Sequence, residues 1–272
     1  MARERLHWPS IRAVMRKDLS AVGRSKAIVL PMLIVPFLML VVLPTVIGLA
    51  ARSQTNIDVS RFLSNIPGDL ARPILRLPVR EQLIVLVNGY LLAPLFLIVP
   101  LMVSAVLAAD AFAGEKERRT LESLLHLPIA ERDLFVAKLL TAFVPAVLLS
   151  WIGFVCFALV TNTVAWPVMH RIFVPTKLWL VMIFWVAPGV AALGLGVMVR
   201  VSARARTTQE ANQLGGAVIL PLIFLAVGQA SGLLLVDIWI ALVVGAFVWV
   251  IAVWLCSRGA HRFTRDQLAA RL

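Results

Sequence analysis

Charged side chains are concentrated in one internal segment of this chain, residues 114–138, GEKERRTLESLLHLPIAERDLFVAK. Five basic and five acidic residues give this segment a net charge of zero. Balanced charge favours contact with a complementary protein surface over binding to an anionic lipid surface. The segment is therefore the first candidate for a functional site.

The residue types that perform catalysis do not form a recognisable set. The sequence has no HExxH, GxSxG or phosphate-binding GK[ST] motif, and its four histidines are scattered. Cys156 and Cys256 fall in or at the end of apolar runs, which indicates packing residues instead of a disulfide framework. We therefore expect no enzyme activity, metal or cofactor on this chain, and any ATPase has to be a separate polypeptide.

Composition places the chain in the membrane. Hydrophobic residues make up 61% of the sequence, against roughly 45–50% in soluble domains. The apolar runs do not alternate with polar residues as barrel strands do, so the spans are predicted to be helical. Proline interrupts most of them. Six spans without Asp, Glu, Lys or Arg are predicted in one all-α domain over residues 1–272: 27–50, 83–109, 139–160, 178–199, 214–236 and 238–256.

The distribution of basic residues predicts the orientation. One alternate set of connections holds 19 of the 26 Lys and Arg residues, which predicts that both termini and residues 114–138 are cytoplasmic. The net charge of +12 is then a topology signal, and no nucleic-acid partner is expected. The opposite set includes five arginines in residues 51–82. Of these, Arg72 and Arg76 either touch lipid headgroups or an anionic substrate, or form a solvated loop face.

An amphipathic helix is predicted before the first span, over residues 8–26. Ile11, Val14 and Val22 recur at helical spacing, with basic residues on the remaining face. Such a helix lies in the headgroup layer, with Ser10 as a plausible N-cap. The alternative is an unstructured basic leader.

The uncharged spans restrict how the protein could be driven. An ion-coupled transporter needs ionisable groups near the membrane midplane, and the six predicted spans have none. Free energy has to enter elsewhere, and the charged segment is the candidate. Between Gly114 and Pro128 it has good helix formers and a leucine ridge, which predicts a short cytoplasmic helix over residues 114–128. The alternative is a solvated loop held by exposed ion pairs.

Three stretches of the sequence resemble one family. AGEKERRTLESLLHLPIAERDLFVAKLL is similar to the signature of type-2 ABC exporter permeases, particularly the bacterial sodium-efflux-like and drug-export-like branch. VMRKDLSAVGRSKAIVLPMLIVPFL and RARTTQEANQLGGAVILPLI resemble the family's elbow helix with its first span, and the start of its fifth span. The resemblance implies that residues 114–128 are a coupling helix that sits in a cleft of an ATPase subunit. The implied contact residues are Glu115, Glu117, Arg118, Arg119, Thr120, Leu121, Glu122, Leu124 and Leu125.

The same resemblance implies an assembly. Two permease subunits, identical or close paralogues, would join two copies of an ATPase that binds ATP and magnesium, in a prokaryotic cytoplasmic membrane. The substrate path would run between the permeases, along spans one, two and five, where Asn88, Tyr90 and Gln229 are candidates for path or gate; interhelical hydrogen bonding is their alternative role. The expected function is the permease subunit of an ATP-driven exporter. The alternative is a membrane anchor or scaffold that holds a cytoplasmic partner without translocating anything.

Overall fold

The computed structural model describes residues 6–53, 68–117, 129–203, 205, 207–216, 220, 223–224 and 238–260, and all regular structure in these ranges is helical. Five helical rods are long and apolar enough to cross a membrane: Lys26–Arg52, Val79–Gly114, Glu131–Met169, Lys177–Ser202 and Ile238–Gly259. They contain five of the six predicted spans. The remaining predicted span, residues 214–236, lies mostly outside the described residues.

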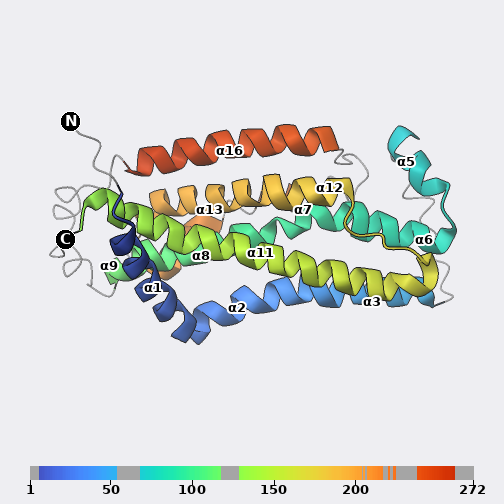
Figure 1. Cartoon of the computed structure of the whole chain (residues 1–272), viewed down its shortest axis with the longest axis horizontal. Coiled ribbons are helices and arrows are strands. Elements are labelled where there is room, and N and C mark those ends of the chain that lie inside the picture. Colours follow the sequence, from blue (N-terminus) through green and yellow to red (C-terminus); the bar gives the residue numbers. More distant parts are fainter. Residues whose placement is uncertain are drawn as a thin grey trace.

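The rods lie side by side along the length of the molecule (Figure 1). Their parts, in chain order, are α2 (Lys26–Phe37), η1 (Leu38–Val42) and α3 (Leu43–Arg52); α6 (Val79–Ile84), η2 (Val85–Leu91), α7 (Leu92–Phe96), α8 (Ile98–Ala109), η3 (Asp110–Gly114) and α9 (Glu115–Glu117); α11 (Glu131–Met169); α12 (Lys177–Val181), η4 (Met182–Val186) and α13 (Ala187–Ser202); and α16 (Ile238–Ala260). Two short helices, α5 (Gly68–Leu75) and α14 (Thr208–Gly215), lie outside the rods.

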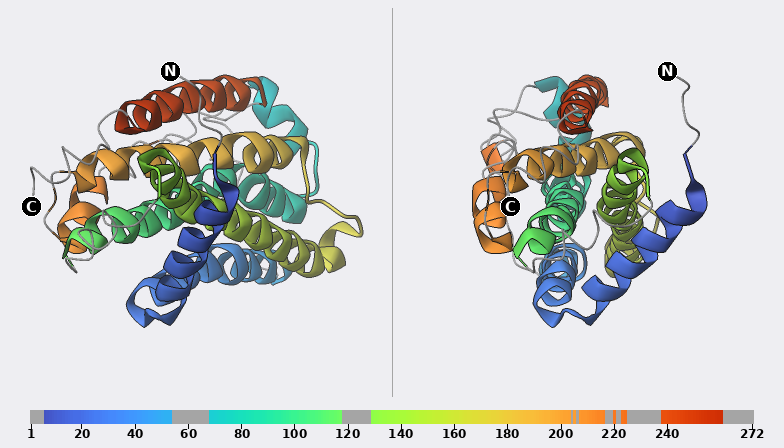
Figure 2. Two further views of the ribbon diagram at one scale, coloured as in Figure 1. Left: turned by 60° about the vertical axis from the view of Figure 1, so that its left-hand side comes forward. Right: turned by 90° about the vertical axis from the view of Figure 1, so that its left-hand side faces the viewer.

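A separate helix, α1 (Trp8–Arg24), lies obliquely across one end of the bundle, which we call the α1 end (Figure 2). The prediction of a helix here is confirmed, whereas its place in the headgroup layer stays a prediction. Ser10 is not the N-cap: the helix begins at Trp8 after the N-cap residue His7, and Ser10 Oγ lies 2.8 Å from His7 Nδ1. Pro9 occupies the first turn, where its missing N–H leaves no helical hydrogen bond unmade.

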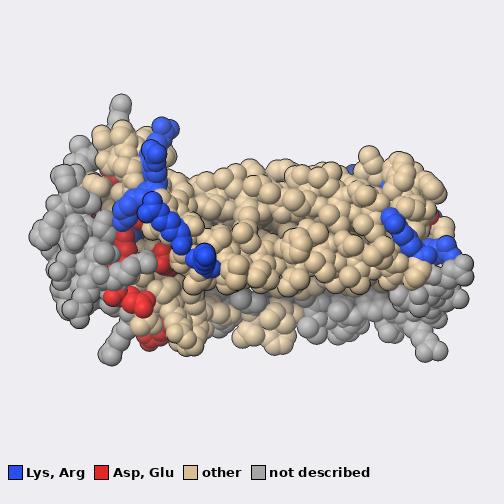
Figure 3. Space-filling model, turned by 90° about the horizontal axis from the view of Figure 1, so that it is seen from below, with Lys and Arg blue, Asp and Glu red and all other residues tan. Residues whose placement is uncertain are grey.

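The distribution of surface charge changes along the long axis of the bundle. On the face shown in Figure 3, Lys and Arg gather towards the two ends, and an uncharged belt separates them. Side chains such as Leu33, Val155 and Phe247 are exposed along the rods. A bilayer covers such apolar surface, because lipid tails solvate it as well as a protein core does. The chain is therefore a multi-pass membrane protein.

The second and fourth rods form the centre of the bundle. In each of them 67% of the most apolar stretch is buried, against 17–28% in the other three. An aromatic cluster joins these two rods to α11: the Trp179 ring of α12 lies 4.6 Å from Phe157 and 5.4 Å from Phe154 of α11, and 5.5 Å from Phe96 of α7, measured between centroids. The Trp179 indole N–H donates to the carbonyl of Asn88 at 2.8 Å, which satisfies the one polar group of this buried side chain.

Small residues set the spacing of α13 from its neighbours. A Cβ at Gly194 would lie 2.7 Å from Ser104 Oγ of α8, and one at Gly196 would lie 2.9 Å from Leu255 Cβ of α16. Glycine at both positions therefore allows close packing of α13 on α8 and α16. Cys256 Sγ of α16 also donates to the carbonyl of Ala192 at 3.8 Å, so this free cysteine is a packing residue, as predicted.

The α13 and α16 helices run parallel. Gly189 of α13 faces Trp249 of α16, and Val199 faces Gly259, so contacting positions advance together along both helices. Both helices consequently end at the α1 end of the bundle (Figure 1).

Three π-helical turns stand just before prolines. The turns η1, η2 and η4 end two or three residues before Pro44, Pro94 and Pro188. A proline ring clashes with the carbonyl four residues earlier and donates no hydrogen bond. A widened turn ahead of the proline shifts that carbonyl and lets the rod continue. The predicted proline interruptions are therefore absorbed here within continuous helical rods.

Pro167 in α11 is accommodated by a side chain and not by a widened turn. Proline cannot donate to the carbonyl of Thr163, and Arg52 at the end of α3 donates to that carbonyl at 3.3 Å and to the carbonyl of Val164 at 2.7 Å. At the same end, Arg171 pairs with Glu81 at 2.9 Å. Arg72 and Arg76 are exposed, and their predicted contact with lipid or an anionic substrate stays open.

Candidate functional site

The charged segment begins at the end of η3, includes α9 and ends in the first turns of α11, and α9 and the start of α11 both lie at the α1 end of the bundle (Figure 1). The structure describes two of the nine predicted contact residues, Glu115 and Glu117. The other seven lie outside the described residues: Arg118, Arg119, Thr120, Leu121, Glu122, Leu124 and Leu125. The site is therefore built from the two ends that hold this segment.

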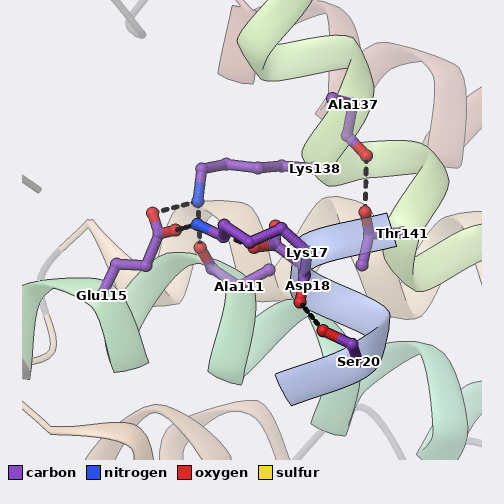
Figure 4. A network of polar contacts seen from close by, with 8 residues as sticks. All are labelled: Lys17, Asp18, Ser20, Ala111, Glu115, Ala137, Lys138 and Thr141. Atoms are coloured by element: carbon purple, nitrogen blue, oxygen red, sulfur yellow. Dashed lines mark hydrogen bonds and ion pairs between the residues drawn. The ribbon is translucent and has the colours of Figure 1, made fainter. Parts of the chain in front are cut away.

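A buried cluster of charges surrounds the first carboxylate (Figure 4). Lys138 of α11 pairs with Glu115 Oε2 and donates to the carbonyl of Ala111 in η3. Lys17 of α1 lies 3.3 Å from Glu115 Oε1 and 3.0 Å from Asp18 Oδ1. We call Lys17, Asp18, Glu115 and Lys138 the Glu115 cluster. It joins three elements that are distant in sequence.

Burial makes the central pair of this cluster strong. The side chain of Lys138 is 1% exposed and that of Glu115 is 7% exposed, so water screens their attraction little. The Lys138 ammonium also lies 5.6 Å from the centre of the Phe112 ring, within the range of a cation–π contact. Removing either partner would leave an uncompensated charge in a dry site.

The edge of the cluster faces solvent through Lys17, whose side chain is 55% exposed. Burial lowers the pKa of Lys17, but hydrogen bonds and attraction from Asp18 and Glu115 outweigh this, so its pKa lies above the usual 10.5. Lys17 therefore stays charged at physiological pH and keeps α1 attached to α9.

Sequence reasoning missed two members of the cluster, Asp18 and Lys138. Asp18 is 9% exposed and continues the buried stripe of Ile11, Val14 and Val22 on α1. A carboxylate inside an apolar stripe is the signal that could have identified it. The sequence places Lys138 only among the five basic residues of the segment, whereas the structure buries it. Its place between Leu134 and Ala142 in a buried stripe is the corresponding signal.

The second carboxylate, Glu117, connects the segment to α14. Its Oε2 accepts from the backbone N–H of Thr208 at 2.9 Å and from the Thr208 hydroxyl at 2.8 Å. Thr207 caps the same helix, since its hydroxyl accepts from the N–H of Glu210 at 3.1 Å. A carboxylate at this position satisfies a free N–H and interacts favourably with the helix dipole.

Apolar packing completes the attachment of α1. Ile11 and Val14 pack against Leu134 and Ala137 of α11, and all four are buried. The backbone N–H of His7 also donates to Asp133 Oδ2 at 3.3 Å. The first turns of α11, which continue the charged segment, are thus held by α1 along their length.

The contacts at this site link several helices to one segment. The described parts of α1, α9, α11 and α14 meet at the two ends of one segment, through ion pairs and hydrogen bonds of known geometry. Within the described ranges, no group of three His, Cys, Asp or Glu side chains could hold a metal ion. Such a site can pass a displacement of the segment to several helices at once. Whether Glu115 also contacts a partner stays a prediction; its carboxylate is held by two lysines of this chain.

The predicted path residues lie elsewhere. Asn88 is 1% exposed in η2, and its Oδ1 accepts no hydrogen bond from the described residues. Tyr90 is half-buried between two apolar clusters in the same turn. Gln229 lies outside the described residues. A role of these residues in a path or gate stays a prediction.

Comparisons with known proteins agree with this architecture. A search of curated proteins found no match. A sequence model described as "ABC-2 family transporter protein" matches residues 12–240, which include most of α1, the Glu115 cluster, the charged segment and α14. Because the match covers most of the sequence and the structure shows a multi-pass helical bundle, this chain belongs to the ABC-2 family of transporter membrane proteins.

Proposed function

We propose that this chain is the permease subunit of an ATP-driven exporter and that residues 114–128 form the coupling helix that receives motion from a separate ATPase. The observation that carries the proposal is the attachment of the segment's first carboxylates. Glu115 is paired with α11 and α1, and Glu117 holds the start of α14. A displacement of α9 would reach all three elements through these contacts.

A sixth crossing is part of the proposed topology. The α13 helix ends at the α1 end, and α16, which runs parallel to it, begins at the opposite end. The chain between them has to connect the two ends. The predicted fifth span, residues 214–236, has a suitable length and composition for this crossing. With α1 and the charged segment on the cytoplasmic side, both termini are cytoplasmic.

Membership of the family supports the assembly that we propose. Two permeases, identical or paralogous, would enclose the substrate path, and two ATPase copies would supply ATP hydrolysis with magnesium. This chain would itself carry no enzyme activity or cofactor. Its membrane would be the cytoplasmic membrane of a prokaryote.

Purification with an ABC ATPase encoded beside it tests the proposal. The complex in nanodiscs is expected to hydrolyse ATP, and Glu117→Ala is expected to lower that rate several-fold while the subunits still co-purify. Leu121→Asp, at a position outside the described residues, is expected to abolish co-purification. Glu81→Ala is the matched control, because it removes a carboxylate at the opposite end of the bundle.

An unchanged ATPase rate and unchanged assembly in both Glu117→Ala and Leu121→Asp would refute docking at this segment. The anchor alternative makes a different prediction: the partner would bind through residues 114–128, and Glu117→Ala would not alter its ATP hydrolysis.

A further inference from the structure

Two arginines stack on one tryptophan at the α1 end of α13 and α16. Arg200 stands in the last turn of α13 and Arg258 in the last turn of α16. Their guanidinium carbons lie 4.9 Å and 4.4 Å from the centre of the Trp254 ring. Both distances refer to one ring, so the two cations are separated by no more than their sum. The proposed function makes no use of this cluster.

The helix pairing fixes the position of both cations. A Cβ at Gly259 would lie 2.8 Å from Val199 Cγ1, so α13 and α16 touch backbone to side chain next to Arg200 and Arg258. Trp254 is four residues before Arg258, on the same face of α16. The Arg200 guanidinium reaches the same ring from α13. The cluster is therefore built by packed helices and not by a loop.

The cluster has unbalanced positive charge. Within the part of the chain that the structure describes, neither Arg200 nor Arg258 forms a salt bridge with a carboxylate. The C-terminal ends of the two helices contribute about half a negative charge each, which two full positive charges exceed. An anion that binds here would gain attraction from both guanidinium groups.

An apolar stripe leads to the cluster along the outer face of α16. Val243, Phe247, Val250 and Trp254 recur at spacings of three or four residues, and they are 69%, 65%, 68% and 46% exposed. The stripe lies on a membrane-spanning helix, and tryptophan prefers the boundary between acyl chains and headgroups. Acyl chains along the stripe would place their phosphate beside Arg200 and Arg258.

We propose that Arg200, Trp254 and Arg258 form a binding site for the headgroup of an anionic phospholipid whose acyl chains lie along the exposed stripe of α16. The occupant is a lipid and not a soluble phosphate, because the apolar stripe continues directly from the cationic cluster. Basic residues between transmembrane helices near the membrane surface suit such headgroups.

Native mass spectrometry of the purified chain tests this site with phosphatidylglycerol as the probe and phosphatidylcholine as the zwitterionic reference. The wild type is expected to retain phosphatidylglycerol preferentially. The double variant Arg200→Gln/Arg258→Gln is expected to bind it roughly 30-fold more weakly, since each basic residue near a membrane surface contributes about a fivefold preference. Lys at both positions is expected to restore most of the preference. This result would show that the Gln variant binds less lipid because it lacks the charges and not because it is unfolded.

Two further measurements make the test specific. Arg80→Gln/Lys177→Gln, which removes two exposed basic residues of α6 and α12 at the opposite end, is expected to leave the preference unchanged. Glycerol phosphate at millimolar concentration is expected not to displace the lipid. An unchanged preference in the Arg200→Gln/Arg258→Gln variant, an equal loss in the Arg80 and Lys177 control, or displacement by glycerol phosphate would each overturn the proposal. None of these readouts depends on an ATPase partner.

Discussion

Replacing Lys138 with methionine tests the reasoning on the Glu115 cluster most directly. Methionine has a similar length and fills irregular space, so the change removes the charge with little loss of packing. It leaves the buried carboxylate of Glu115 with the Lys17 contact at 3.3 Å, and Lys17 is half-exposed. It also removes the donor to the carbonyl of Ala111.

The expected cost follows from the burial of this pair. Breaking a buried ion pair by removing one partner costs about 3–5 kcal/mol. The remaining contact with Lys17 places the expected loss near the lower limit, about 3 kcal/mol. For chains of 150–250 residues, 1 kcal/mol shifts the melting temperature by about 2–4 °C, so Lys138→Met is expected to lower it by roughly 6–12 °C.

Thermal unfolding in detergent micelles, followed by tryptophan fluorescence, measures this shift. The matched control is Lys177→Met, at an exposed lysine that begins α12, with an expected change within about 0.5 kcal/mol. The double variant Glu115→Leu/Lys138→Met removes both buried charges and is expected to regain much of the stability, since apolar replacement of a whole buried pair is often neutral.

Equal melting temperatures for Lys138→Met and Lys177→Met would refute the account of the cluster. Additive losses in the double variant would do so as well, because partners in one buried pair should be strongly coupled.

Two further predictions concern stability. Gly194→Ala is expected to destabilise the bundle by about 1–3 kcal/mol through overpacking against Ser104, whereas Gly23→Ala, where the added methyl group meets nothing within 4 Å, is expected to stabilise α1 by about 0.5–1 kcal/mol; thermal melts of the two variants provide the comparison. The raised pKa of Lys17 means that its contribution is complete below pH 10.5 and is lost as the pH rises through the folded-state pKa. The difference in melting temperature between wild type and Lys17→Met should therefore shrink above pH 10.5, and a constant difference up to pH 12 would contradict the assignment.

The sequence predicts the spans well because an apolar run of sufficient length has few structural options in a membrane. The five rods begin and end close to the predicted limits, and the largest differences are extensions, as in α11, which starts at Glu131 and not at residue 139. Charged residues at span ends can continue a helix when a partner is available. A prediction that ends each span at a charged residue leaves Lys138 outside the helix. Its ion-pair partner, Glu115, is more than 20 residues away in the sequence, so the pair is not visible there.

The Glu115 cluster and the contact of Glu117 with Thr208 were harder to predict, because their partners are distant in the sequence. Glu115 looks like an ordinary solvated charge until the packing of α1 on α11 places Lys17 and Lys138 beside it. The resemblance to permeases identified the charged segment but not the attachment of Glu117 to Thr208, because a contact between residues 91 positions apart leaves no local pattern. The contact residues beyond Glu117 and the path residue Gln229 lie outside the described residues and stay predictions.

The role of Arg52 bears on how topology is deduced from basic residues. Counting Lys and Arg treats each one as a charge that resists crossing the membrane, and Arg52 belongs to the minority set that opposed the majority. Its guanidinium instead acts as a ligand for two main-chain oxygens, one of which Pro167 had left without a donor. A basic residue in such a position is explained by the neighbouring proline and carries no information about the side of the membrane. Leaving Arg52 out of the count strengthens the orientation that the other basic residues indicate.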